Sequence, residues 1–453
     1  MKIVILGGVA AGAKAAAKTR RLLPDAIIDL YTDDTHVSYS SCGLPYYIQG
    51  NFEDYRTLLV RSPEEFEAQG IHIHLLSKAI KIIPESQQVL IQDLKENRAN
   101  LVEYDKLVIA TGARPVIPSI ENVNLKNVFT VRHIEDGINI RNKALNSKHA
   151  TIIGSGYIGL ELLEAFTELG LRVTMVEFAP YVAPVFDDDI SKIIMEQLSS
   201  ISNGRFEILT SELVTAFQAN ENNEVCGIKT GSGKKFETDM VVICAGVRPN
   251  VEFAIEAGIA IGETGAIKVD KRMHTNLPNI YACGDCAEKN LIITGTKVWV
   301  PLGSTANKEG RTAAINLSGG CDDFDGILGS AVVRCMSFTM SMTGLTEKKA
   351  KQLGFHPESV NVTKNDKVGY MPDVNNITLK LIADRTTGLL LGGQAVGSGD
   401  ADKRINSLTA ALLGRLTVEE FTKNDLTYAP PFAPTIDPLL NAAELLLAKI
   451  RKD

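Results

Sequence analysis

The chain has 453 residues, of which 45% are hydrophobic and 22% are charged, and its formal net charge is -7. This length predicts about three domains, and the negative charge argues against a nucleic-acid or anionic-membrane partner. We find no apolar run long enough to span a bilayer and no signal peptide before the first strand, so we expect a cytoplasmic protein without a membrane partner.

The N-terminal stretch predicts a βαβ unit. Residues 2–6 are a β-branched apolar run typical of a buried parallel strand, and a glycine-rich turn at 7–12 leads into an Ala- and Lys-rich helix. A second strand covers 27–31. Such a unit places a helix N-terminus where it can bind a pyrophosphate. Val9 replaces one glycine of the usual fingerprint and the expected acid is displaced, so this unit alone leaves a dinucleotide site open.

A single cysteine, Cys42, lies in the small-residue and aromatic stretch 39–47. A short helix is expected from Leu44, which puts Cys42 at or just before a helix N-terminus, where the backbone N–H groups favour the thiolate. Taken alone, buried packing is the commoner role for such a cysteine. The chain has seven cysteines at irregular spacing, which does not fit a secreted disulfide framework.

A second βαβ unit follows a full G-x-G-x-x-G turn, Gly154–Gly159, after the strand at 151–153. Its helix runs to about Leu169, and the strand 172–176 is closed by Glu177. The acid lies close to the ~20-residue separation expected for a carboxylate that binds a ribose 2′-hydroxyl. A carboxylate there disfavours a 2′-phosphate, so we expect NADH rather than NADPH; a glycine turn without a ligand is the alternative.

An internal repeat connects the two units. Residues 107–115 and 241–249 both consist of an apolar strand followed by Gly-x-Arg-Pro. Two dinucleotide-binding units in one chain suggest two dinucleotides, and a flavin with a nicotinamide is the common pairing. Hydride has to pass between them, so both must meet at one site.

Residues 279–285 predict a strand and a turn that carries Asp285, whose carboxylate can accept a hydrogen bond from a ribityl hydroxyl. The pair Cys283 and Cys286 overlaps this turn. A thioredoxin-like or metal role is the alternative to incidental small residues, but no second CxxC provides a zinc site. We therefore prefer the incidental explanation and expect no metal.

The rest of the chain predicts a helix after Val300, a boundary at 319–320 and a separate α/β unit from Asp322 to Asp453. Strands are expected over 331–338, 359–362, 378–383 and 389–396, and helices over 400–416 and 439–450. The last helix is apolar and Ala-rich, which indicates packing or a dimer surface.

The motifs in order are the 7–12 turn, Ser41-Cys42-Gly43-Leu44-Pro45-Tyr46, the Thr111-Gly112 segment, Gly154–Gly159, Tyr281-Ala282-x-Gly284-Asp285 and Asp425-Leu426-x-Tyr428-Ala429-Pro430-Pro431-Phe432. This set resembles the single-cysteine branch of the pyridine nucleotide-disulfide oxidoreductases. That branch includes coenzyme A-disulfide reductase, NADH oxidase and NADH peroxidase. The resemblance implies an α/β fold with an FAD domain (1–115 and 247–321), an NAD(P)H domain (116–246) and a C-terminal dimerisation domain (322–453).

The resemblance also implies site residues. Cys42 is the redox centre, and Tyr428, with Tyr370 as a second candidate, reaches it from the other subunit of a homodimer. The expected cofactor-binding residues are Gly7, Gly8, Ala10, Ala11, Gly12, Thr32, Asp33, Ser41, Thr111, Gly112, Arg132, Gly154, Gly156, Tyr157, Ile158, Gly159, Glu161, Glu177, Gly246, Gly284, Asp285, Leu302 and Ala306. Tyr157 is expected to gate the nicotinamide and Glu161 to hold its carboxamide.

Two positions separate members of the branch, and a third separates the branch from the glutathione reductase-type enzymes. Oxidases and peroxidases carry a histidine in the first glycine turn, where this chain has Ala10. The disulfide reductases usually have Asn before the cysteine, and here Ser41 stands there, as in the oxidases and peroxidases. Glutathione reductase-type enzymes need a second cysteine at position 47, which is Tyr47, and a C-terminal histidine. Cys42 therefore has to form a mixed disulfide with a small thiol, or a sulfenate.

The small thiol is expected to be coenzyme A. Lys14, Lys18 and Arg21 fall on one face of the first helix with Arg20 beside them, and such a stripe is either a solvated surface or a clamp for the ADP end of coenzyme A. Lys403 and Arg404, from the C-terminal domain, are further candidates. We expect an FAD- and NADH-dependent coenzyme A-disulfide or persulfide reductase without a fused rhodanese-like module. The alternatives are an NADH oxidase or peroxidase, and a flavin-containing NADH sensor with a structural Cys42.

Overall fold

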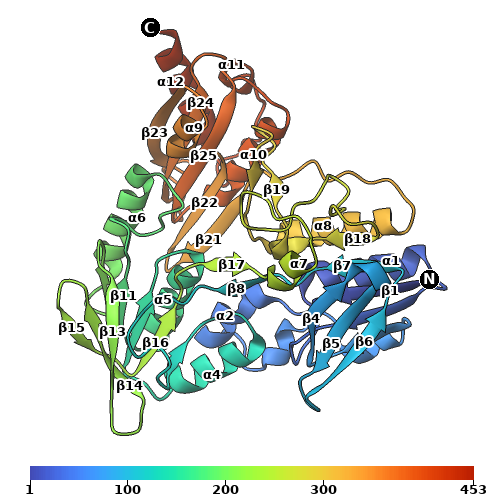
Figure 1. The fold of residues 1–453 in the computed structure, drawn as a ribbon. Coiled ribbons are helices and arrows are strands. Elements are labelled where there is room, and N and C mark those ends of the chain that lie inside the picture. The colour runs from blue at the N-terminus through green and yellow to red at the C-terminus, as the bar shows by residue number, and fades with distance from the viewer. Residues whose placement is uncertain (453) are drawn as a thin grey trace.

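The computed structural model describes residues 1–452; residue 453, the last of the predicted C-terminal domain, lies outside them. Three five-stranded sheets organise the chain. In Figure 1 the N-terminal residues lie at the lower right, the middle of the chain at the lower left and the C-terminal residues at the top. Within residues 1–452, no helix has the length and apolar character needed to cross a bilayer.

The first unit is built on a parallel sheet in the order β18-β7-β1-β2-β3. The strands are β1 (Lys2–Leu6), β2 (Ile27–Tyr31), β3 (Ile71–His74), β7 (Lys106–Ile109) and β18 (Ile280–Ala282). Both strands predicted in the first βαβ unit are confirmed, and the helix between them is α1 (Ala10–Leu22). Its partner helix α8 (Gly303–Leu317) packs so closely that a Cβ on Gly310 would lie 2.3 Å from the carbonyl oxygen of Ala11.

Smaller elements complete the first unit. They are α2 (Leu44–Gln49), α3 (Pro63–Glu67), β4 (Ser77–Ile83), β5 (Gln88–Asp93), β6 (Arg98–Glu103), α7 (Glu252–Glu256), β19 (Lys289–Asn290), β20 (Lys297–Val298) and the 3-10 turns η1 (Ser41–Gly43), η2 (Tyr55–Leu58), η3 (Pro84–Ser86) and η4 (Gly284–Cys286). Strands β4, β5 and β6 form an antiparallel meander. The turn η1 and helix α2 carry the cysteine stretch.

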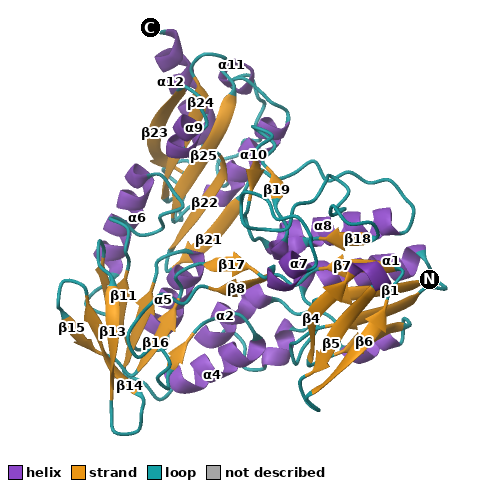
Figure 2. Cartoon of the chain, in the orientation of Figure 1, coloured by secondary structure: helices purple, strands orange, loops and turns teal. Residues whose placement is uncertain are grey.

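The second unit repeats the plan with a parallel sheet in the order β12-β11-β10-β16-β9. Its elements are β9 (Val128–Phe129), α4 (Ile134–Ala144), β10 (His149–Ile153), α5 (Tyr157–Glu168), β11 (Arg172–Val176), α6 (Asp188–Ile201), β12 (Phe206–Leu209), β13 (Val214–Ala219), β14 (Val225–Thr230), β15 (Lys235–Glu237) and β16 (Met240–Ile243). Figure 2 shows helices beside its strands, as in the first unit.

The repeated Gly-x-Arg-Pro segments pair with each other. They form β8 (Ala113–Pro115) and β17 (Val247–Pro249), an antiparallel two-stranded ribbon in which Arg114 is opposite Arg248. The chain therefore passes from the first unit to the second and back through two adjacent connections, which lie between the two units in Figure 1.

The C-terminal unit is an antiparallel sheet in the order β21-β22-β25-β24-β23 with helices beside it. Its elements are β21 (Ala331–Cys335), β22 (Phe338–Gly344), α9 (Glu347–Gln352), β23 (Pro357–Asn365), β24 (Asn376–Asp384), β25 (Leu390–Gly397), α10 (Ala401–Leu413), α11 (Val418–Phe421) and α12 (Pro438–Arg451). The single strand predicted over 331–338 is wrong, because Met336 has a φ of 55° and turns the chain into a hairpin. The predicted α/β class, with two Rossmann-like units and a C-terminal unit, is confirmed.

Candidate active site

A cavity of about 1250 Å³ lies where the first and second units meet. Most of the predicted cofactor-binding residues line it: Gly7, Gly8, Ala10, Ala11, Thr32, Asp33, Ser41, Thr111, Gly112, Arg132, Gly156, Tyr157, Ile158, Glu161, Gly246, Gly284, Asp285, Leu302 and Ala306. Cys42 is part of the same wall. Gly12, Gly154, Gly159 and Glu177 are not part of the wall and act on the shape of the two glycine turns instead.

The first glycine turn requires glycine at two positions. Gly7 has a φ of 105°, and a Cβ there would lie 2.2 Å from the carbonyl oxygen of Ala110. A Cβ on Gly12 would lie 1.9 Å from the carbonyl oxygen of Gly7. The chain therefore turns sharply from β1 into α1, a helix of 13 residues whose first two, Ala10 and Ala11, line the cavity. A pyrophosphate fits such an end.

The second glycine turn has the same geometry. Gly154 has a φ of 98°, and its Cβ would lie 2.4 Å from the carbonyl oxygen of Cys244. A Cβ on Gly159 would lie 2.1 Å from the carbonyl oxygen of Gly154, whereas one on Gly156 would have no atom within 4 Å. Packing therefore does not require glycine at position 156, and the missing side chain leaves the backbone there accessible from the cavity.

Glu177 ends β11 as predicted, but its carboxylate is bound to its own turn. Oε2 accepts hydrogen bonds from Ser155 N at 2.8 Å and Ser155 Oγ at 2.6 Å, and Oε1 accepts one from Ala179 N at 2.8 Å. The side chain is buried. Glu177 therefore fixes the glycine turn in addition to any contact with a ribose.

In the first unit the buried acid that follows β2 is Asp34, which the motif did not single out. Asp34 Oδ2 accepts hydrogen bonds from Tyr39 Oη at 2.6 Å and from His133 Nδ1 at 2.8 Å. Burial alone would raise the pKa of Asp34, but these bonds outweigh it and lower the pKa. The same bond raises the pKa of His133. Because Tyr39 lies three residues before Cys42, Asp34 anchors the loop that carries the cysteine.

Asp34, His36 and Glu135 also bring ligand-type atoms within 4.8 Å of one another. These atoms already bond to protein groups, since Asp34 accepts from Tyr39 and Glu135 accepts from Thr35. We assign no metal to this trio.

Asp285 follows β18 in the turn η4 and offers an unused acceptor. Its Oδ1 is buried and has no hydrogen-bond partner, and burial raises the pKa of its carboxyl. Behind it, the fully buried Lys289 donates to the carbonyl oxygens of Gly284 and Ala287, both at 2.9 Å. An orphaned buried acceptor in a cavity wall is costly unless a donor meets it, and a ribityl hydroxyl is such a donor. The residues present therefore fit FAD.

Cys42 lies in η1, immediately before α2, as the sequence predicted. Its side chain is exposed to the cavity. The expected thiolate stabilisation is not found: the surrounding walls desolvate the thiol and raise its pKa, and the carboxylates of Glu161 and Asp285 add to the rise. Helix α2 has only 6 residues, so its dipole is too short to outweigh these effects.

Glu161 and Tyr157 line the second-unit side of the cavity. Burial raises the pKa of Glu161 to about 7 and that of Tyr157 to about 12. Tyr46, from the cysteine stretch, donates a hydrogen bond to Glu161 Oε1 at 3.4 Å. This contact joins α2 of the first unit to α5 of the second.

Cys42 also lines a second, smaller cavity of about 470 Å³. Lys14 and Arg21 line it, as does Arg61, which sequence reasoning missed because no motif marks it and only the fold brings it near. The guanidinium of Arg61 lies 4.9 Å from the ring centroid of Phe66. Three cations thus surround a pocket that reaches the cysteine sulfur.

Two predicted basic residues do not reach this cavity. Lys18 is outside its wall. Arg20 points the other way and donates to the carbonyl oxygens of Pro24 and Gly70, so it ties α1 to the turn before β3. Arg20 points away from its neighbour Arg21 because successive positions on a helix point about 100° apart. Lys403 donates to the carbonyl oxygen of Phe432 and Arg404 is buried on Asp437, so neither lines the cavity.

Tyr370 and Tyr428 belong to the C-terminal unit and are 75% and 49% exposed. Neither lines either cavity of its own chain, so a role at Cys42 requires a second subunit. Cys283 and Cys286 are buried, and burial raises both pKa values. Cys286 Sγ contacts the carbonyl oxygens of Cys283 and Ile109, in keeping with the packing role preferred from the sequence.

Two sequence families match the chain. The pyridine nucleotide-disulphide oxidoreductase family matches residues 1–310. The dimerisation domain of the same family matches residues 330–439. Together the two matches include both glycine turns, Cys42, Asp285, Tyr370 and Tyr428.

Curated relatives align over nearly the whole chain. An NAD(P)H coenzyme A polysulfide/persulfide reductase of Pyrococcus horikoshii is 36% identical over 98% of this chain and 98% of its own. An NADH oxidase of Methanocaldococcus jannaschii is 34% identical over 99% of both chains. A coenzyme A disulfide reductase of Staphylococcus aureus is 31% identical over 95% of this chain and 96% of its own.

A solved structure has the same fold. The NAD-dependent persulfide reductase from A. fulgidus superposes with a TM-score of 0.95 at 34% identity, over 99% of this chain and 83% of that one. The similarity thus extends to the arrangement of all three units.

Proposed function

This chain belongs to the pyridine nucleotide-disulphide oxidoreductase family, in the group of disulfide or persulfide reductases and NADH oxidases; we propose that it reduces coenzyme A disulfide, or a related persulfide, through Cys42 alone. The family is FAD-dependent and uses NAD(P)H. We propose that residues 1–115 and 247–321 bind FAD and that residues 116–246 bind NADH. We propose that residues 322–453 form the dimer interface.

One observation supports the proposal above the others: Cys42 lines both cavities. The larger cavity is lined by residues of both glycine turns and by Asp285. The smaller one contains Lys14, Arg21 and Arg61. A sulfur at this junction can receive electrons from one side and meet a disulfide on the other.

FAD, bound by the first glycine turn and Asp285, would accept hydride from reduced nicotinamide and deliver two electrons to sulfur. The Cys42 thiolate attacks a disulfide R–S–S–R, forms the mixed disulfide Cys42–S–S–R and releases one RS⁻, which takes up a proton. Two electrons and a second proton then cleave the mixed disulfide into the Cys42 thiolate and RSH. Tyr428 of the partner subunit, with Tyr370 of the partner subunit as a second candidate, would donate the first proton.

Among residues 1–452 Cys42 is a free cysteine, and the one other cysteine that lines a cavity with it is the half-buried Cys244, whose pKa burial raises to about 12. Position 47 is Tyr47, a buried residue of α2. Among residues 1–452 the exposed cysteines besides Cys42 are Cys226 and Cys321, and neither lines a cavity with it. We propose that the mixed disulfide forms with a small thiol.

The charge of the smaller cavity favours a thiol that carries phosphates. Lys14, Arg21 and Arg61 present donors that suit the ADP portion of coenzyme A, since guanidinium groups bind phosphate in a bidentate manner. A carboxylate at Glu177 opposes a 2′-phosphate, so NADH is the preferred reductant.

Cys42→Ser should abolish reduction of coenzyme A disulfide by NADH while FAD stays bound, because serine cannot form the mixed disulfide. Full activity of this variant would contradict the proposal.

Arg61→Met should raise the KM for coenzyme A disulfide about tenfold, as expected for a lost charged contact. It should leave the KM for pantethine disulfide, which lacks the ADP phosphates, unchanged. Lys18→Met, on α1 but outside the cavity, is the matched control.

An NADH oxidase that cycles Cys42 through a sulfenate is the second candidate, and Ser41 before the cysteine favours it. Ala10 opposes it, because the first turn lacks the imidazole that assists O–O chemistry. NADH-dependent oxygen consumption faster than disulfide reduction would select the oxidase.

A further inference from the structure

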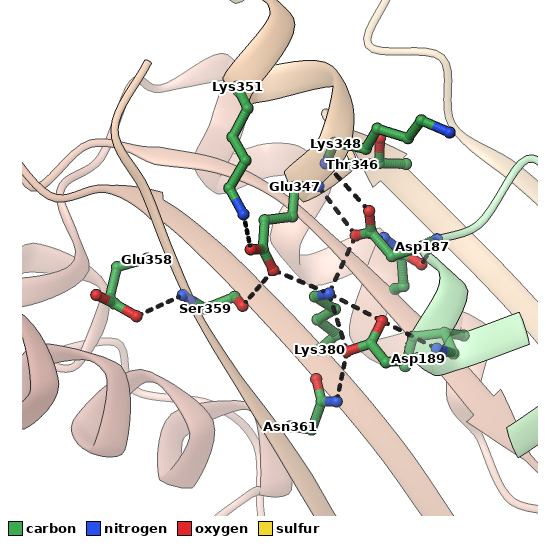
Figure 3. Close-up of polar contacts among 12 residues, drawn as sticks. Asp187, Asp189, Thr346, Glu347, Lys348, Lys351, Glu358, Ser359, Asn361 and Lys380 are labelled. Atoms are coloured by element: carbon green, nitrogen blue, oxygen red, sulfur yellow. Dashed lines mark hydrogen bonds and ion pairs between the residues drawn. The ribbon is translucent and has the colours of Figure 1, made fainter. Parts of the chain in front are cut away.

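A buried ionic cluster joins the second unit to the C-terminal unit, with Lys380 at its centre (Figure 3). Lys380, on β24, is 4% exposed. Its Nζ lies 2.9 Å from both carboxylate oxygens of Asp189, 3.3 Å from Asp187 Oδ2 and 3.1 Å from Glu347 Oε2. One ammonium group thus contacts three carboxylates.

The cluster crosses the boundary between two units. Asp187 and Asp189 are at the start of α6 in the second unit, whereas Lys380 and Glu347 belong to the C-terminal unit. The Asp187 carboxylate also accepts hydrogen bonds from Glu347 N at 2.9 Å and Gln394 Nε2 at 2.6 Å. Gln394 Oε1 in turn accepts from Asp187 N at 2.9 Å. Figure 3 shows Asp187 between Lys380 and the first turn of α9.

A second crossing contact involves α5, the helix that begins at the second glycine turn. Glu164 accepts hydrogen bonds from Arg334 at 3.1 Å and from Met336 N at 2.8 Å. Apolar side chains of α5, including Leu160 and Phe166, share one core with β21 and β22. The nicotinamide unit is therefore held to the C-terminal sheet through both α5 and α6.

Strand β24 also reaches the first unit. Ile382, two residues after Lys380 and on the same face of the strand, packs in one cluster with Leu291, which follows β19. Leu291 and Ile327 form a β-bridge that leads into β21. One strand therefore contacts the nicotinamide unit through its ammonium group and the flavin unit through an apolar side chain.

The charges in this cluster explain why Lys380 is essential to the contact between the second unit and the C-terminal unit. Burial alone would lower the pKa of Lys380, and the carboxylates of Asp189 and Asp187 outweigh it and raise the pKa. Burial likewise opposes ionisation of Glu347, but hydrogen bonds from Lys351, Ser359 and Lys380 lower its pKa to about 2. Without the ammonium, two aspartates of one unit would face a glutamate of the other, and like charges would push the units apart.

We propose that Lys380 is a positioning residue for hydride transfer: it locks the nicotinamide unit against the C-terminal sheet and so fixes the second glycine turn relative to the flavin cavity. In that step one proton with two electrons leaves the reduced nicotinamide, which becomes NAD(P)⁺, and is accepted by the flavin. Reacting atoms must approach to roughly 3–3.5 Å, so a small shift of one unit is costly. The role depends on reduction of FAD by NAD(P)H and not on the acceptor or on Cys42.

The test separates the two half-reactions of the FAD-loaded enzyme. Lys380→Met removes the charge and keeps an apolar stem, Lys380→Arg keeps the charge, and Lys351→Met is the matched control. Lys351 also bonds to Glu347, at 2.6 Å, but its side chain is 62% exposed and the pair stays within α9. Flavin absorbance is followed anaerobically after mixing with NADH at several concentrations, and separately when dithionite-reduced enzyme meets a disulfide.

The limiting rate of flavin reduction by NADH should fall about tenfold or more in Lys380→Met. It should recover to within about threefold in Lys380→Arg and stay at the wild-type value in Lys351→Met, since only the first variant loses the charge that crosses the boundary. The rate of disulfide reduction should not change in any variant. A wild-type rate of flavin reduction in Lys380→Met, or an equal fall in both half-reactions, would overturn the proposal.

If Lys380→Met does not accumulate as a folded flavoprotein, Asp189→Asn keeps the proposal testable. The Asp189 side chain is 43% exposed and accepts a further hydrogen bond from Asn361 Nδ2 at 2.7 Å, so this change should be tolerated. It should lower the rate of flavin reduction about threefold, as expected for one weakened charged contact. An unchanged rate in this variant would contradict the role of the cluster.

Discussion

The two glycine turns of this protein have the same backbone but different acids. Gly7 N donates to the carbonyl oxygen of Tyr31 at 2.7 Å, and Gly154 N donates to that of Val176 at 2.8 Å. A Cβ on Gly7 would lie 2.2 Å from the carbonyl oxygen of Ala110, and a Cβ on Gly154 would lie 2.4 Å from that of Cys244. Each of these oxygens directly follows a neighbouring strand. Strand, turn and helix are thus set alike in both units.

The two acids, Glu177 and Asp34, accept hydrogen bonds from different parts of the chain. Glu177 bonds to Ser155 and Ala179, within and beside its own turn. Asp34 bonds instead to Tyr39, in the loop of Cys42, and to His133. The displaced acid of the first unit is therefore connected to the loop of Cys42, while the acid of the second unit is connected to its own glycine turn. The spacing of glycines determines the backbone, and the position of the acid determines which loop it supports.

Gly7→Ala should produce the largest effect in this comparison. The new Cβ overlaps the chain at Ala110 at a φ of 105°, which costs on the order of 3 kcal/mol and weakens FAD binding about a hundredfold. The ratio of flavin absorbance to protein after purification measures it. Wild-type FAD content would show that the first turn does not hold the flavin.

Gly154→Ala carries the matched change in the second turn and should spare FAD. The overlap with Cys244 is similar, so the NADH concentration for half-maximal flavin reduction should rise about a hundredfold. Flavin content should equal that of the wild type. Loss of FAD in this variant would mean that the two turns are not independent.

Glu177→Gln tests whether the second acid supports its turn. The amide can accept fewer of the hydrogen bonds from Ser155 and Ala179, so kcat/KM for NADH should fall about tenfold. The value for NADPH should change less, because relief of the repulsion on a 2′-phosphate offsets the loosened turn. Unchanged use of NADH would contradict the bonding role of Glu177.

The smallest effect is a pH dependence confined to the first unit. Hydrogen bonding to Asp34 raises the pKa of His133 above its ordinary 6.5, so the pair stabilises the fold fully below about pH 6.5 and loses that contribution as pH rises through the raised pKa. The pair is partly exposed and screened, and we expect the unfolding temperature to fall by about 1–2 °C between pH 6 and 9. His133→Asn should remove this slope, as followed by flavin fluorescence during heating; a slope that persists would assign it to another group.

Local patterns were sufficient for much of the fold. The apolar runs at 2–6 and 151–153, each directly before a glycine turn, predicted strands that the structure confirms. The break at Met336 was not predicted, because a positive φ at a methionine leaves no mark in an apolar run. The meander β4–β6 was also missed, since its strands have neither glycine turns nor a motif to mark them.

Site prediction failed where the direction of a side chain or a distant contact decides the outcome. Cys42 was found because its turn and helix are local in sequence. Arg20 was predicted to bind coenzyme A, but it bonds to Gly70, 50 residues away, and Arg61 was not predicted although it lines the smaller cavity. The desolvation that raises the pKa of Cys42 likewise depends on residues from other elements.

In the proposed reaction, Cys42 works without a second cysteine and exchanges with coenzyme A. The intact mass of the purified, non-reduced protein tests it most directly. We predict an adduct on Cys42 with the mass of coenzyme A that NADH removes, and its absence in Cys42→Ser. A bare Cys42, or one that carries only oxygen, would contradict the claim and favour the oxidase.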